Sequence, residues 1–231
     1  MAHADAAGRR ARTLAQGAGR LPVLERSVSA AVVDEAALRA ALARWCDALE
    51  AAAPELNALD GRLGDGDLGA TLAKCALNVR EVLAADAAGI GATLQRCAQA
   101  CAKASGSSFG TLLAIAFLSA AKTAGERERL DRDALVELLR TVQQALAARG
   151  GASLGDKTML DSLHAVADAL HGAGDASAAA LKAAARQAAQ RALDALRAQP
   201  NRIGRARMFA DKSIGRDDPG MVAVLRMVQA L

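Results

Sequence analysis

Tyrosine is absent from the 231-residue sequence, and aromatic residues together make up only 2% of it. Stacking of bases on aromatic side chains is a common way to hold single-stranded nucleic acids, so a nucleic-acid-binding function is disfavoured despite the formal charge of +4. Hydrophobic residues nevertheless amount to 52%, so leucine and alanine must fill the core. Alanine has the highest helix propensity of all residues, and we therefore expect an all-α fold.

The sequence also lacks CxxC pairs, long apolar runs and alternating β-branched segments. No histidine follows the four cysteines at zinc-finger spacing, so we interpret Cys46, Cys75, Cys97 and Cys101 as reduced core residues of a cytoplasmic protein. No stretch approaches 18 uninterrupted apolar residues, and no compact apolar run follows the first arginines. We therefore expect neither a membrane span nor a secretory signal. Strands are not predicted either.

Helical periodicity is absent from residues 1–30 and present through residues 31–231. The first segment is predicted to be a flexible tail, and the second to be one helical domain without an internal linker. Apolar residues at helical spacing predict eight helices, over about 34–49, 72–82, 94–105, 112–117, 131–146, 160–170, 176–198 and 218–228. Short loops between them favour a single barrel or bundle of antiparallel helices.

Residues 56–71 form the first loop of unusual composition, with Asp60, Asp65 and Asp67 separated by small residues. Glycine permits tight turns that would bring the three carboxylates together, and like charges that close repel unless a cation lies between them. Oxygen ligands favour a hard cation, Mg²⁺ or Ca²⁺. An EF-hand is excluded, because the twelfth position counted from Asp65 is Ala76. An Asp/Gly turn that caps two helices is the structural alternative.

The same loop contains a formal GxGxxG motif at Gly64, Gly66 and Gly69, with a helix start over residues 69–71. A dinucleotide-binding Rossmann fold requires a strand before this motif, whereas a helical segment precedes it here. The bare carboxylates would repel a pyrophosphate, so a phosphate chain could bind only with a metal. N–H groups at the helix start could then receive its oxygens. The loop therefore predicts binding of a magnesium–nucleotide complex.

Two further loops are candidates for phosphate contacts. Residues 103–111 are rich in serine and glycine and could cradle phosphate with backbone N–H groups, although a serine helix cap is the simpler interpretation. Residues 150–158 resemble a P-loop, but they have one residue too many before Lys157 and no preceding strand. We therefore reject a Walker A loop and interpret Asp156 and Lys157 as an exposed pair at a helix start.

The fourth loop, residues 204–220, combines Arg205 with a turn at Asp218, Pro219 and Gly220, in which Asp218 is predicted to cap the last helix. Together and in this order, the four loops resemble the nucleotide-binding domain of dihydroxyacetone kinases. That domain is the C-terminal half of ATP-dependent kinases and the separate L subunit of the phosphotransferase-system enzyme. The resemblance covers about residues 55 to 220. It implies a barrel of eight helices with a nucleotide at one end.

The resemblance also implies the residues of the site. Asp60, Asp65 and Asp67 would hold two magnesium ions that clamp the phosphates of ADP or ATP. The residues expected against the nucleotide are Leu68, Gly69, Ala70, Thr71, Ala104, Ser105, Gly155, Arg205, Asp218, Pro219 and Gly220. The chain departs from the family at Leu68, where relatives often have histidine or threonine.

The implied function is Mg-assisted phosphoryl transfer to dihydroxyacetone, or to a related ketose such as erythrulose, held by a substrate-binding partner subunit. No catalytic residue beyond the metal ligands is assigned, because such transfer depends on positioning and charge neutralisation. His164 and His171 are interpreted as structural or exposed. ADP is expected to stay bound as a cofactor that a phosphohistidine carrier protein recharges. Exchange of ATP, a non-catalytic nucleotide-sensing module and assembly into a homodimer stay open as alternatives.

Overall fold

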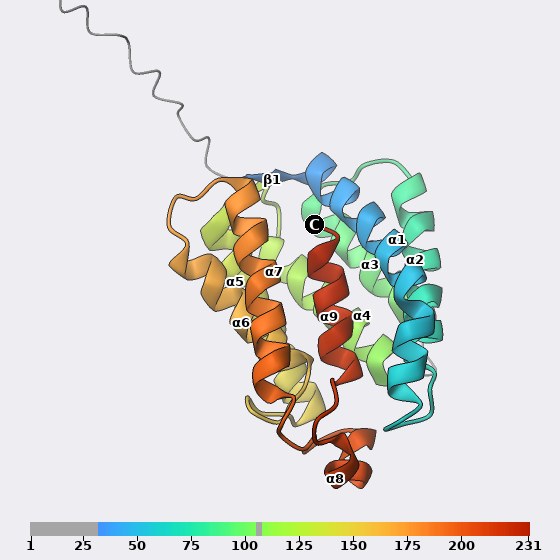
Figure 1. The fold of residues 1–231 in the computed structure, drawn as a ribbon. Coiled ribbons are helices and arrows are strands. Elements are labelled where there is room, and N and C mark those ends of the chain that lie inside the picture. The colour runs from blue at the N-terminus through green and yellow to red at the C-terminus, as the bar shows by residue number, and fades with distance from the viewer. Residues whose placement is uncertain (1–31, 105–107) are drawn as a thin grey trace, which may run out of the picture.

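The computed structural model describes residues 32–104 and 108–231 of the chain (Figure 1). The predicted tail at residues 1–30 and Ser105 of the serine-rich loop lie outside the described residues. The elements are, in chain order, β1 (Val33–Asp34), α1 (Glu35–Asp60), α2 (Leu68–Ala84), α3 (Ile90–Lys103), α4 (Ser108–Ala124), β2 (Arg129–Leu130), α5 (Arg132–Gly150), α6 (Met159–Gly172), α7 (Ala178–Leu196), the 3₁₀ helix η1 (Arg205–Phe209), α8 (Ala210–Ser213) and α9 (Pro219–Gln229). Within the described residues, eight helices have 11 residues or more, and they correspond to the eight predicted segments.

The eight long helices form a closed ring. Each packs against the next along the chain, and α9 completes the ring through contacts with α1, α6 and α7 (Figure 1). Leucine, alanine and valine side chains fill most of the interior, and Leu49, Leu56, Leu72, Val79 and Met221 are fully buried there. Full burial of such a side chain contributes about 1.5–3 kcal/mol. The all-α fold class is confirmed.

The few aromatic and cysteine residues that the sequence has lie mainly in this core. Trp45 of α1 meets Phe117 of α4 edge to face, with ring centroids 5.7 Å apart. All four cysteines are buried and free, as predicted. Burial raises the pKa of the Cys46 thiol to about 11 and that of Cys97 to about 12, which keeps both protonated at neutral pH.

Aspartates begin several helices as the sequence predicts. The side chains of Asp34, Asp131 and Asp218 each accept a backbone N–H of the following turn at 2.8 Å. Pro219 occupies the first turn of α9, where its missing N–H costs nothing. Each such cap contributes about 1 kcal/mol. These local signals place the helix starts to within a residue or two.

Two local expectations are wrong. Residues 33–34 pair with residues 129–130 in a short antiparallel ladder, although no strand was predicted. Two residues are too few to show an alternating pattern. The helix α1 also runs through Pro54 to Asp60, so the first part of the expected 56–71 loop is helical. Leu56 is fully buried in the core, and this packing outweighs the local cost of the proline.

The candidate loops gather at one end of the ring. The α1–α2, α5–α6 and α7–α9 connections all lie at the end that carries α8 in Figure 1. The antiparallel course of successive helices explains this, because every second connection returns to the same end. Among the described helices, none combines the length and the hydropathy that crossing a bilayer requires.

Candidate functional site

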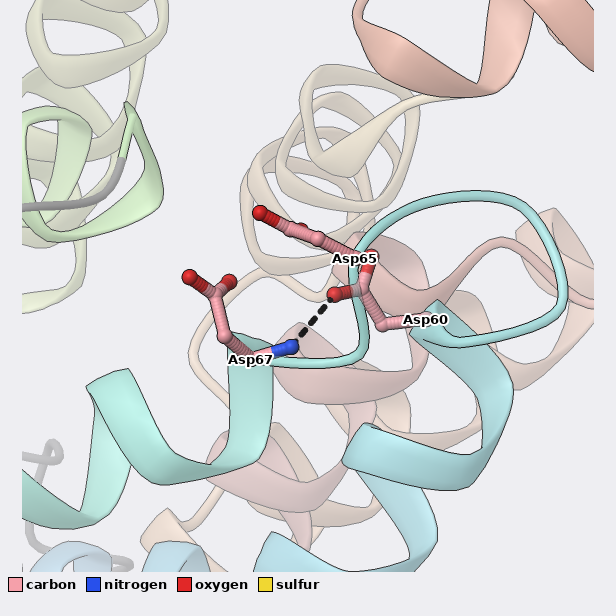
Figure 2. A group of neighbouring side chains, drawn as sticks. All are labelled: Asp60, Asp65 and Asp67. Carbon is pink, nitrogen blue, oxygen red and sulfur yellow. Dashed lines mark hydrogen bonds between the residues drawn. The ribbon is translucent and has the colours of Figure 1, made fainter.

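Three aspartates meet where α1 ends and α2 begins. Asp60 is the last residue of α1, Asp67 precedes α2, and Asp65 lies in the connection. One carboxylate oxygen of each lies within 4.8 Å of the others (Figure 2). Asp60 Oδ2 accepts the N–H of Asp67 at 3.0 Å and that of Leu68 at 3.3 Å, so Asp60 folds the connection back onto the end of α1.

This arrangement differs from an ordinary Asp/Gly capping turn. Asp67 occupies the cap position of α2, yet its side chain makes no capping hydrogen bond. Asp60 and Asn57 perform that function instead, since Asn57 Oδ1 accepts the N–H of Ala70 at 3.0 Å. The Asp67 carboxylate is therefore not used by the helix that it precedes. It is available to a ligand.

Glycines bring the carboxylates close. A Cβ atom on Gly64 would lie 2.8 Å from Asp60 Oδ1, and Gly66 adopts a φ of +76° that other residues rarely adopt. Gly69 serves packing, because a Cβ atom there would lie 2.0 Å from the carbonyl oxygen of Ala53 on α1. The glycines of this motif therefore serve a tight turn and a close helix contact.

Arg205, which is distant in the sequence, also lies at this carboxylate cluster. It begins η1 in the α7–α9 connection, and its guanidinium forms an ion pair with Asp65. Both side chains are about half exposed, at 53% and 43%. The cluster thus already attracts a cationic group, which is the electrostatic behaviour expected of a cation site.

A cavity of about 660 Å³ opens beside these residues, within the usual size range of small-molecule sites. The predicted site residues on its wall are Asp60, Asp65, Asp67, Leu68, Arg205, Asp218, Pro219 and Gly220. Apolar side chains also line it, among them Phe109, Leu112 and Met159. The cavity therefore offers both charged groups and apolar surface.

Five other predicted residues that the structure describes do not line this cavity. Gly69, Ala70 and Thr71 lie in the first turn of α2, where Thr71 donates its N–H to the carbonyl oxygen of Asp67 at 2.9 Å. Ala104 is buried at the end of α3. Gly155, with a φ of +87°, donates its N–H to Asp161 Oδ1 at 2.6 Å.

The cavity wall also contains residues that sequence reasoning did not assign to the site. Phe109, Leu112, Arg149, Thr158 and Met159 are among them. Phe109 packs against the first turn of α9, since a Cβ atom on Gly220 would lie 3.2 Å from its ring. Thr158 and Met159 belong to the Gly-Asp-Lys-Thr-Met motif at residues 155–159. This motif was the sequence signal that could have assigned them to the site.

Two charged residues beside the cavity are buried. The interpretation of Lys157 as exposed is wrong, because the residue is only 1% exposed and its ammonium donates to backbone carbonyls. Asp218 is 9% exposed. Burial raises the pKa of Asp218 to about 6, although the N–H of Met221 and the amide of Asn201 lower it.

His164 and His171 lie on α6 away from the cavity wall. His164 Nε2 is 3.3 Å from Asp168 Oδ2, with both side chains about half exposed, and His171 is exposed. The interpretation of these histidines as structural or exposed is confirmed.

Comparison with known proteins agrees with this geometry. A family model described as DAK2 domain matches residues 62–231, which is most of the chain. The chain belongs to the DAK2 domain family. The matched range includes Asp65, Asp67 and the whole α7–α9 connection, and it begins two residues after Asp60.

Relatives of this DAK2 domain include complete subunits and parts of longer enzymes. The "PEP-dependent dihydroxyacetone kinase, ADP-binding subunit DhaL" of Escherichia coli (strain K12) is 31% identical over 194 residues, which cover 82% of this chain and 92% of that subunit. The "L-erythrulose 1-kinase" of Mycolicibacterium smegmatis is 33% identical over 181 residues, which cover 77% of this chain and 32% of that kinase. The chain thus spans about a third of the length of the erythrulose kinase that it matches.

The fold has a solved counterpart. The structure of dihydroxyacetone kinase from C. freundii, determined with AMP-PNP and Mg²⁺, superposes with a TM-score of 0.68 over 97% of this chain and 38% of that chain. Sequence identity is 23%, so this likeness shows the fold alone. It agrees with the closed ring of eight long helices in the described part of the chain.

Proposed function

We propose that this DAK2 domain binds ADP or ATP with Mg²⁺ and takes part in phosphoryl transfer to a ketose held by a partner subunit or domain. The observation that carries the proposal is the cluster of Asp60, Asp65 and Asp67 beside a cavity lined by both charged and apolar side chains. Relatives named as an ADP-binding kinase subunit and as erythrulose kinases support it. The acceptor is dihydroxyacetone or a related ketose.

The donor atoms fit magnesium. All three side chains offer carboxylate oxygens, which suit a hard cation, and no soft sulfur or imidazole ligand belongs to the cluster. Asp60, Asp65 and Asp67 would hold two ions together with phosphate oxygens. Bound Mg²⁺ would supply neutralisation of the phosphate chain, which is the main requirement of this chemistry.

The chain's own residues would bind the rest of the nucleotide. The Arg205 guanidinium can accompany the phosphates, because it lies against Asp65 and lines the cavity. Phe109 and Met159 offer the apolar surface on which an adenine ring can pack. The N–H groups of Leu68 and Ala70 already donate to Asp60 and Asn57, so these two groups at the start of α2 are used within the chain.

The requirements of phosphoryl transfer support a ketose-binding partner. In-line transfer requires the acceptor hydroxyl to be held against the terminal phosphate, and without that positioning the effective molarity is lost. The chain matches nearly the whole of a separate subunit but only about a third of single-chain kinases. We therefore propose that a ketose-binding subunit acts with this chain in the cytoplasm, with either ATP or a phosphohistidine carrier as the phosphoryl source.

The first test is titration calorimetry with ADP and Mg²⁺. Asp67→Asn should weaken Mg-dependent ADP binding about 100-fold or more, because it removes a charged metal ligand. Asp175→Asn, an exposed aspartate in the α6–α7 connection, is the matched control and should bind as the wild type does. Equal affinity of Asp67→Asn and wild type would refute the metal site. Binding without transfer, in the presence of every candidate partner, would instead favour the nucleotide-sensing alternative.

A further inference from the structure

Lys157 is an unusual residue for its position. It lies in the α5–α6 connection, two residues before α6, and is among the largest fully buried side chains. Its φ of +62° makes it the one non-glycine residue with a positive φ in the part of the chain that the structure describes. Such a backbone conformation is strained for a residue with a Cβ atom. The strained backbone and the burial of the ammonium both cost free energy, so other interactions of this lysine must offset them.

The Lys157 ammonium has three N–H donors, and three backbone carbonyls accept them. Nζ lies 3.2 Å from the oxygen of Arg197, 2.8 Å from that of Gln199 and 2.8 Å from that of Ser213. Burial lowers the pKa of this ammonium, and the charge of Asp218 opposes that effect. The ammonium lies outside the cavity wall, so it does not belong to the proposed contacts with the nucleotide.

The three carbonyls come from the two ends of one segment. Arg197 and Gln199 precede η1, and Ser213 follows it, so the ammonium joins both ends of residues 197–213. The segment between them has little core of its own. No residue of η1 is buried, and Met208 is 71% exposed. Its placement therefore depends on polar anchors.

Asn201 extends this anchor to the cavity wall. Its amide Nδ2 donates to the carbonyl oxygen of Lys157 at 2.8 Å and to Asp218 Oδ2 at 2.7 Å. Its backbone N–H donates to Ser213 Oγ at 2.8 Å. Asn201 is 1% exposed. The side chain and the backbone of Lys157 are thus both bonded into the segment that presents Arg205.

We propose that Lys157 is a positioning residue that holds Arg205 beside Asp65 and fixes the turn at Asp218 on the cavity wall. It does so by fastening both ends of residues 197–213 through one buried ammonium. The inference rests on the proposed nucleotide site and adds the device that pre-organises one of its walls. Pre-organisation of a loop increases affinity by removing the entropy loss that ordering it on binding would cause.

The test uses the full chain and compares Lys157→Met with Leu181→Ala. Methionine keeps most of the length of the side chain and removes the three donors. Leu181 is buried in α7, near the end opposite the cavity, and its truncation lowers stability without touching residues 197–213. Two readouts are taken well below the melting temperature of both variants: trypsin cleavage mapped by mass spectrometry, and calorimetry with ADP and Mg²⁺. Trypsin can cut after Arg202, Arg205, Arg207, Lys212 and Arg216.

Lys157→Met should be cut within residues 202–216 about tenfold faster than wild type and bind Mg-ADP about tenfold more weakly, because a charged anchor with three hydrogen bonds is lost. Leu181→Ala should match wild type in both readouts. Asn201→Ala, which keeps the ammonium, should show smaller changes of the same sign. If Lys157→Met does not fold, wild-type behaviour of Asn201→Ala would overturn the proposal.

Wild-type cleavage of folded Lys157→Met would overturn the anchoring role. Faster cleavage with unchanged Mg-ADP affinity would overturn the positioning of the site. The two proposals fail separately: if the wild-type chain binds no Mg-ADP, the proposed function falls, and the cleavage rates still decide whether Lys157 fastens this segment.

Discussion

Glu35 and Asp67 lie at opposite ends of the helical ring and are used in opposite ways. At the end away from the cavity, Glu35 accepts the N–H groups of Ala88 and Gly89 and the hydroxyl of Thr93, all within 2.8 Å. At the cavity end, Asp67 caps nothing, although it stands at the start of a helix. Glu35 serves the fold and has its oxygens satisfied by the chain, whereas the Asp67 carboxylate is available to a ligand.

The same contrast extends to ionisation. Hydrogen bonds from Ala88, Thr93 and Gly89 hold the pKa of Glu35 below its ordinary value. Burial instead raises the pKa of Asp218 at the cavity end to about 6. Because the two shifts have opposite signs, Glu35 and Asp218 should change the free energy of unfolding with pH in opposite directions. This difference gives the comparison its strongest test.

The largest expected effect is the pH dependence due to Asp218. Its pKa in the folded chain exceeds the ordinary value of 3.8 by about two units, so the folded state binds the proton more tightly. Its stabilising contribution is therefore complete below pH 3.8 and lost as pH rises through about 6. At about 1.4 kcal/mol per unit, this loss is roughly 3 kcal/mol as an upper value. Urea unfolding of wild type and Asp218→Asn without ligand, between pH 4 and 7.5, measures it.

The free energy of unfolding of wild type relative to Asp218→Asn should decrease from pH 4 to about pH 6 and level off above that. A difference that stays constant with pH would show that Asp218 titrates normally despite its burial. A difference that grows with pH would reverse the sign and indicate that the hydrogen bond from Asn201 dominates over desolvation.

The next effect belongs to the far end of the ring. Glu35→Gln should lower the free energy of unfolding at pH 7 by about 2 kcal/mol, because it weakens charge-assisted hydrogen bonds to the loop before α3. Since the folded pKa of Glu35 is lowered, this loss should shrink as pH falls and the wild-type carboxylate becomes protonated. Urea unfolding at pH 7 and pH 4 measures both. Mg-ADP affinity should not change, and a reduced affinity would show that the two ends are coupled.

Sequence reasoning succeeded where the signal was local. Helix propensity and periodicity predicted eight long helices, and Asp34 and Asp218 are caps because a cap contacts only the turn that follows it. The aspartate cluster was also predictable, since a short glycine-rich connection joins its members.

Lys157 was misinterpreted because its burial depends on residues 40 to 56 positions away, which no local pattern reveals. The same holds for the apolar residues of the cavity lining. Phe109 lies in α4 and Met159 begins α6, and the two line one cavity only after the ring has closed. Tertiary packing decides such positions, and a resemblance limited to motifs places only the residues within those motifs.

The smallest expected effect concerns Asp67 and tests its contrast with Glu35 most directly. Without metal, Asp67→Asn should raise the free energy of unfolding by about 0.5 kcal/mol, because it relieves repulsion among partly exposed carboxylates. Thermal unfolding in a chelator-containing buffer at low salt measures this gain, and added salt should reduce it by screening. The variant that weakens Mg-ADP binding would then be the one that stabilises the free protein, the opposite of Glu35→Gln. A loss of stability in Asp67→Asn would contradict the comparison, because it would mean that Asp67 serves the fold as Glu35 does.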